Sequence, residues 1–135
     1  MARILIVEDE ASVSQQIAAA LKNAGHETLA AADGEEALQA LGVGTRFPPP
    51  PVDLILLDVM LPNVNGFMVC TRMQEDARTK IVPVLMVSGY DDFKEPFSKF
   101  PNIVGWIDKP FEPREMLDKI AETLGKRPSA SPDAA

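Results

Sequence analysis

Polar side chains that could hold a cation and a phosphoryl group follow four separate apolar runs of the sequence. They are Glu8, Asp9, Asp58, Ser88 and Lys109. Three carboxylates brought to one place would repel one another and raise each other's pKa unless a cation held them. Ligation by carboxylates, a main-chain carbonyl and waters is the pattern typical of Mg²⁺. A hydroxyl and a lysine facing that ion would form a seat for a phosphoryl group.

The elements that must position these residues are short apolar strands that alternate with amphipathic helices. The strands are expected at 3–7, 27–32, 52–58, 81–87 and 102–107. The helices are expected between Asp9 and Gly25, at 35–41, 67–76 and 112–124, with a doubtful one within 90–101. This alternation predicts an α/β fold, a parallel sheet with helices on both faces. Because parallel strands end at one edge, where ligands bind in such sheets, we expect the five residues to meet there.

The run that ends in Asp58 is the most informative of the five. Leu54 to Leu57 are four consecutive aliphatic residues with neither helical nor alternating periodicity. Such a run fits a strand buried on both faces. A carboxylate at the end of a buried strand is therefore expected at the edge of the sheet.

Each of these polar residues also has an ordinary structural explanation. Asp58 could be a turn or cap residue, and Glu8 with Asp9 could supply negative charge to a helix N-terminus. Ser88 could close a turn, and Lys109 could be a solvated charge beside a proline. The structural explanation would have to apply separately at each of four strand ends. Each of these ends carries a group that aspartyl-phosphate chemistry requires. We therefore favour the functional interpretation.

Length, charge and cysteine content limit the class of protein. The 135 residues are enough for one domain, expected at 1–125, with a Ser/Pro/Ala-rich tail at 126–135 predicted to be disordered. The net charge of −7 argues against nucleic-acid or anionic-membrane partners. The single cysteine excludes an internal disulfide, and no apolar run approaches the about 18 residues of a membrane span. We expect a soluble, cytoplasmic protein. The prolines at 48–51 are a spacer or a docking segment for a polyproline-binding module.

Four longer motifs give the chain a family resemblance. They are ILIVEDE at 4–10, AADGEEAL at 31–38, VDLILLDVMLP at 52–62 with Asn-Gly at 65–66, and DKPF at 108–111. Over about residues 2–125 the chain resembles the receiver domain of two-component response regulators. The resemblance implies the sheet order 2-1-3-4-5, with Asp58 on the central strand.

The resemblance also implies roles. Asp58 would accept a phosphoryl group from a phosphohistidine of a sensor histidine kinase or phosphotransfer protein, and the change would alter binding to a downstream protein. Ser88 resembles the switch hydroxyl that bonds the new phosphoryl group, and Lys109 the lysine that pairs with one of its oxygens. The Lys109–Pro110 peptide bond would be cis.

For the metal, the resemblance implies Mg²⁺ held mainly by the acids. Asp9 looks like a direct ligand, Glu8 would act mainly through a bound water, and Asp58 and the main-chain carbonyl of Met60 would complete the protein ligands. Asp58 needs no activating base because a carboxylate is already ionised at neutral pH.

Trp106 departs from the family pattern. It stands three residues before Lys109, where the family usually has Tyr or Phe in a ring that swings inward as part of the switch. An indole is larger and its N–H needs a partner when buried. Trp106 could remain outside as a binding surface, occupy an enlarged pocket, or be a partly buried anchor.

The segment 90–101 departs further. Pro96 and Pro101 limit any helix there to one or two turns, so the fourth helix should be short or irregular. Phe93, Phe97 and Phe100 could be core residues or an exposed partner patch. The usual dimer or effector surface is therefore in question.

The preferred interpretation is a stand-alone, non-enzymatic switch. A receiver fragment of a longer regulator or hybrid kinase is the alternative within the class. The alternative outside it is a Mg²⁺-dependent phosphohydrolase working through an aspartyl phosphate. Such an enzyme would want a second acid near its nucleophile, as in Asp-x-Asp, and position 60 is Met.

Overall fold

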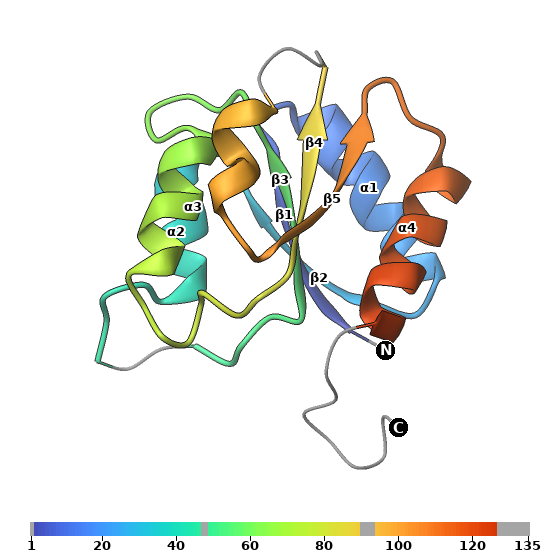
Figure 1. Ribbon diagram of the computed structural model, residues 1–135. Coiled ribbons are helices and arrows are strands. Elements are labelled where there is room, and N and C mark those ends of the chain that lie inside the picture. Colours follow the sequence, from blue (N-terminus) through green and yellow to red (C-terminus); the bar gives the residue numbers. More distant parts are fainter. Residues whose placement is uncertain (1, 47–48, 90–93, 127–135) are drawn as a thin grey trace.

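The computed structural model describes residues 2–46, 49–89 and 94–126, and forms one five-stranded parallel sheet with helices on both faces (Figure 1). The strands are β1 Arg3–Val7, β2 Glu27–Ala31, β3 Leu54–Asp58, β4 Val84–Ser88 and β5 Ile103–Asp108. The α-helices are α1 Ala11–Asn23, α2 Gly34–Leu41, α3 Gly66–Gln74 and α4 Pro113–Lys126. The strand order is β2-β1-β3-β4-β5, so the predicted fold class and order are confirmed. The predicted disorder of the tail concerns residues 127–135, which lie outside the described part.

Each face of the sheet has its own hydrophobic core. Alternate residues of a strand point to opposite faces, so Ile55 and Leu57 pack toward α2 and α3, whereas Leu54 and Leu56 pack toward α1 and α4 (Figure 1). All four side chains are at most 1% exposed. Burial on both faces explains why this segment is a continuous apolar run.

The register of the central strands brings the acids to one level. β3 lies between β1 and β4, and Val7 pairs with Leu57 while Asp58 pairs with Val87. The residue after β1, Glu8, therefore lies level with Asp58. The residues that follow β4 and β5 reach the same edge because all strands are parallel.

Side-chain caps fix the starts of the two helices that flank the loop after β3. Asp33 Oδ1 accepts a hydrogen bond from the Glu36 amide at 2.8 Å, and Glu36 Oε1 accepts one from the Ala32 amide at 3.0 Å. Asp33 is thus the N-cap of α2, and Glu36 also bonds the amide of the residue that precedes this cap. At the start of α3, Asn65 Oδ1 accepts a hydrogen bond from the Met68 amide at 2.9 Å.

A short 3₁₀ helix, Glu95–Lys99, occupies the described part of the segment where a fourth α-helix would lie. Pro96 stands in its first turn, where a missing N–H costs least. Phe97 and Phe100 are 4% and 5% exposed, and both rings meet Phe67 edge to face. The short fourth helix is confirmed, and Phe97 and Phe100 are core residues. Phe93 lies outside the described residues.

Most element boundaries differ from the sequence prediction by one to three residues, and the start of β4 differs most. The strand expected at 81–87 begins only at Val84, and Ile81 is 75% exposed. The reason is Pro83, which has no N–H to donate to a neighbouring strand. At the other end of the chain, α4 continues to Lys126, one residue into the expected tail.

Candidate functional site

Three carboxylates gather at the carboxyl edge of the sheet. Glu8, Asp9 and Asp58 each offer an oxygen atom, and these oxygens all lie within 4.8 Å of one another. Glu8 and Asp58 are 4% and 5% exposed, whereas Asp9 is exposed to solvent. An all-oxygen donor set with an open side fits a hard cation that keeps several waters, as Mg²⁺ does. The acidic cluster could therefore bind a metal ion.

Lys109 bridges two of these acids. Its Nζ donates to Glu8 Oε1 at 2.7 Å and to Asp58 Oδ2 at 2.8 Å. Burial opposes the charged form of the lysine, but the hydrogen bonds and charges of Asp58 and Glu8 outweigh it, so the pKa of Lys109 is raised. The main chain fixes the position of this residue, because the Lys109 amide donates to the Ser88 carbonyl at 2.8 Å and the Lys109–Pro110 bond is cis, as predicted.

The surroundings of Glu8 favour its protonated form. The pKa of its carboxyl is raised to about 7, chiefly by burial; the hydrogen bond from Lys109 opposes this rise, and the hydrogen bond and charge of Asp58 contribute to it. A carboxyl of this kind gains most from a cation that stabilises its ionised form. A cation bound at this carboxyl would therefore compete with its protonation.

Asp58 is held at both carboxylate oxygens. Oδ2 accepts from Lys109, and Oδ1 accepts from the Met60 amide at 2.9 Å. Met60 is 67% exposed, and its contact with the site is made by its main-chain amide. The carboxylate is thus fixed at the end of a rigid, fully buried strand.

Ser88 lies on β4, the strand next to β3, and Trp106 lies on β5, the strand next to β4. Ser88 is the last residue of β4 and is 4% exposed, one position past the residue that pairs with Asp58. Trp106 is half-buried on β5, with its ring edge-on to Phe97 at 5.6 Å and Lys94 Nζ 5.3 Å from the ring centroid. This half-buried packing is compatible with the partly buried anchor, one of the three alternatives. The switch roles of both residues stay predictions.

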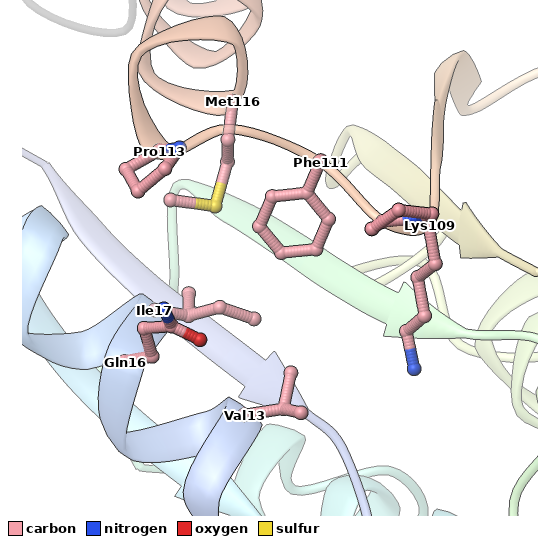
Figure 2. Close-up of a pocket in the computed structure, with 8 residues that line it drawn as sticks. Val13, Gln16, Ile17, Lys109, Phe111, Pro113 and Met116 are labelled. Carbon is pink, nitrogen blue, oxygen red and sulfur yellow. The ribbon is translucent and has the colours of Figure 1, made fainter.

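A pocket of about 310 Å³ adjoins Lys109, and sequence reasoning did not predict it (Figure 2). Its walls come from α1, the loop after β5 and the start of α4. The lining residues are Val13, Gln16, Ile17, Lys109, Pro110, Phe111, Pro113 and Met116. Most of them are apolar, and α1 and α4 are about a hundred residues apart in the chain. Such a pocket depends on tertiary packing and leaves no local signal beyond the Lys-Pro-Phe motif.

Gly66 packs closely against the backbone at the end of β3. A Cβ atom at this position would lie 2.7 Å from the Asp58 carbonyl oxygen and 3.2 Å from Val59 Cα. We expect Gly66→Ala to destabilise the protein by about 1–3 kcal/mol, because the backbone at the end of β3 must shift. Urea unfolding measures this change.

Gly125 provides the matched control, since nothing lies within 4 Å of a Cβ built there. Gly125→Ala, in α4, should be neutral or stabilising by at most about 1 kcal/mol. Equal stability of the Gly66→Ala variant and the wild type would show that the tight contact is not maintained in solution.

The sequence profile of the response regulator receiver domain matches residues 4–121. The chain belongs to this family. It is a receiver domain of the kind found in two-component systems. RpaA of Synechocystis sp., described as a DNA-binding dual master transcriptional regulator, is 38% identical over 136 residues, which cover 100% of this chain and 54% of that protein. The phosphate regulon regulatory protein PhoB of Pseudomonas aeruginosa is 38% identical over 127 residues, covering 90% and 51%.

Solved receiver structures share the fold. The chemotaxis protein CheY4 of Vibrio cholerae superposes with a TM-score of 0.77 at 32% identity, covering 90% of this receiver domain and 98% of that chain. A CheY-like receiver domain protein of Methanospirillum hungatei gives a TM-score of 0.78 at 29% identity, covering 94% and 96%. The doubly wound receiver architecture is therefore shown by both sequence and structure.

The receiver domain spans about half the length of the curated relatives it matches. RpaA is named as a DNA-binding protein, so the expectation of no nucleic-acid partner stays a prediction for this chain. Among the helices of the described ranges, none has the length and apolar character needed to cross a bilayer.

Proposed function

We propose that this receiver domain is a phosphorylation-dependent signalling switch in which Asp58 accepts a phosphoryl group from a phosphohistidine. The observation that carries the proposal is the Asp58 carboxylate itself, buried at the end of β3 and grouped with Glu8, Asp9 and Lys109. The phosphodonor would be a sensor histidine kinase or a phosphotransfer protein. The apolar pocket beside Lys109 offers such a protein a surface next to the reacting carboxylate (Figure 2).

In the transfer step, an oxygen of the Asp58 carboxylate forms a bond to phosphorus as the bond from phosphorus to the histidine nitrogen breaks. The electron pair of that bond remains on the imidazole nitrogen. Phosphoryl transfer needs positioning and countercharge more than covalent help from the protein. Lys109 supplies a positive charge within hydrogen-bond distance of Asp58, and the Ser88 hydroxyl would bond the transferred group.

Glu8, Asp9, Asp58 and the main-chain carbonyl of Met60 would hold Mg²⁺, with Glu8 acting mainly through a water. When bound, Mg²⁺ supplies countercharge to the phosphoryl oxygens. The support for this set is the convergence of the three carboxylates and the raised pKa of Glu8. The fixed Met60 amide keeps the adjoining main chain beside the acids.

The phosphorylated form would change the binding of a downstream protein, and hydrolysis of the aspartyl phosphate would reset the switch. Trp106 lies on β5 between the site and the 3₁₀ helix, so its packing on Phe97 is the route by which the site could reach that surface. We place this activity in the cytoplasm, where the phosphodonor would meet it.

A phosphohydrolase that works through the same aspartyl phosphate is the rival from another class. Position 60 disfavours it, because the exposed Met60 side chain cannot protonate a leaving group. Incubation with Mg²⁺ and acetyl phosphate, followed by intact mass measurement, separates the two. A switch accumulates one phosphoryl group per chain, whereas continuous phosphate release at an enzyme-like rate would contradict the proposal.

A further inference from the structure

We propose that Asn63 and Asp33 are positioning residues for the metal and phosphoryl site. Their side-chain hydrogen bond holds the loop after β3 against the start of α2, and this keeps the Met60 main chain in place beside Asp58. The inference rests on the proposed function, because it concerns the same site. It assigns a role to two residues that contact neither the phosphoryl group nor the metal.

The bond joins residues 30 positions apart. Asn63 Nδ2 donates to Asp33 Oδ2 at 3.1 Å. The other oxygen of Asp33 caps α2 by accepting from the Glu36 amide. One carboxylate therefore ties the loop to a helix end, and the same carboxylate is fixed there by its N-cap hydrogen bond.

The backbone at Asn63 shows that the loop is held in a specific conformation. Its φ is 64°, and among the described residues it is the only non-glycine residue with a positive φ. Asparagine and aspartate enter this left-handed region more readily than other side chains, yet at some cost in free energy. Such a conformation persists when neighbouring contacts stabilise it. The hydrogen bond to Asp33 is one such contact.

The close contact between Gly34 and Val64 gives independent support. A Cβ atom at Gly34 would lie 1.9 Å from the Val64 carbonyl oxygen, so the first residue of α2 touches the loop directly. Where α3 begins, a Cβ atom at Gly66 would lie 2.7 Å from the Asp58 carbonyl oxygen. The later part of the loop is thus packed between the start of α2 and the end of β3.

Met60 lies in this loop, between Asp58 and Asn63. Its amide fixes Asp58 Oδ1, and its carbonyl is the proposed main-chain metal ligand. A loop released from α2 would let the Met60 main chain move away from the acids. Residues that orient metal ligands from behind typically change metal affinity about 10–100-fold when mutated. We expect the low end of that range here, because the Asn63–Asp33 bond is exposed to solvent.

A charge swap tests the bond. Asn63→Asp tolerates the same backbone conformation but places two carboxylates opposite each other, which breaks the bond. Adding Asp33→Asn restores a donor and an acceptor, keeps a good N-cap residue and returns the net charge to the wild-type value. Asn63→Asp alone adds a negative charge, which by simple electrostatics would strengthen Mg²⁺ binding. A weakening therefore has the opposite sign to a pure charge effect.

The readouts are the Mg²⁺ dissociation constant from calorimetry and, in metal-free protein, hydrogen exchange of the Met60 amide. Asn63→Asp should weaken Mg²⁺ binding about tenfold and speed exchange of that amide, and the double variant should restore both. Asn63→Gly, which accepts a positive φ without strain, should weaken binding in the same direction and serves if Asn63→Asp does not fold. Unchanged affinity in the Asn63 variants, or a double variant as weak as Asn63→Asp, would overturn the proposal.

Glu8→Gln separates the possible failures. If it weakens Mg²⁺ binding and the Asn63 variants do not, the metal site stands and the positioning role is wrong. If the wild type does not bind Mg²⁺, or Glu8→Gln binds it as tightly, the proposed metal site fails and the positioning role fails with it.

Discussion

Asp58→Asn is expected to abolish the phosphoryl adduct that wild-type protein forms with Mg²⁺ and acetyl phosphate. An amide oxygen cannot replace the carboxylate as a nucleophile. The substitution keeps the shape of the side chain, and the asparagine oxygen can still accept the hydrogen bond from Met60, so the fold should persist. Intact mass measurement over time shows whether the adduct forms.

Asp108→Asn is the matched control for this loss. Asp108 also ends a strand of the same sheet, but its side chain is 64% exposed and pairs with Lys94 at 3.4 Å, outside the acidic cluster. We expect this variant to accumulate the adduct as the wild type does. An adduct that persists in Asp58→Asn would place the phosphoacceptor elsewhere.

Lys109→Met should slow adduct formation about 10²-fold or more, because it removes a preorganised positive charge from the reacting carboxylate. Lys109 Nζ is the hydrogen-bond partner of both Glu8 and Asp58. Without it, two buried carboxylates lose their lysine partner, and further negative charge arrives with the phosphodonor. The rate of adduct formation at fixed acetyl phosphate and Mg²⁺ measures the effect.

Two further lysine variants sharpen this test. Lys109→Arg keeps the charge in a bulkier, planar form and should fall between Lys109→Met and the wild type. Lys94→Met removes a lysine that lies near Trp106 and Asp108 rather than at the carboxylate cluster, and should phosphorylate close to the wild-type rate. A Lys109→Met variant that reacts as fast as the wild type would remove the lysine from the mechanism.

The parts of the site predicted from sequence are those that depend on strand ends. Leu54 to Leu57 fit a strand buried on both faces, and the expected parallel arrangement places Glu8, Asp9 and Asp58 at one edge of the sheet. The short fourth helix was equally predictable, because proline acts locally. The strand order came from the family resemblance, since periodicity alone does not distinguish one parallel order from another.

The parts not predicted depend on contacts between distant segments. The bond between Asn63 and Asp33 joins residues 30 positions apart, and neither side chain has a pattern that names the other. The packing of Trp106 against Phe97 follows from a shortened helix whose exact path no local rule gives. The close approach of Gly66 to the Asp58 carbonyl also emerges only from the fold.

The identity of the phosphorylated residue decides whether the end of β3 carries the phosphoacceptor. Borohydride reduces an aspartyl phosphate to homoserine with release of phosphate, and peptide mass mapping then locates the converted residue. After treatment with Mg²⁺ and acetyl phosphate, homoserine should appear at position 58 and at no other aspartate. Conversion at Asp9 or another aspartate, or a stoichiometric adduct that yields no homoserine, would contradict phosphorylation of Asp58.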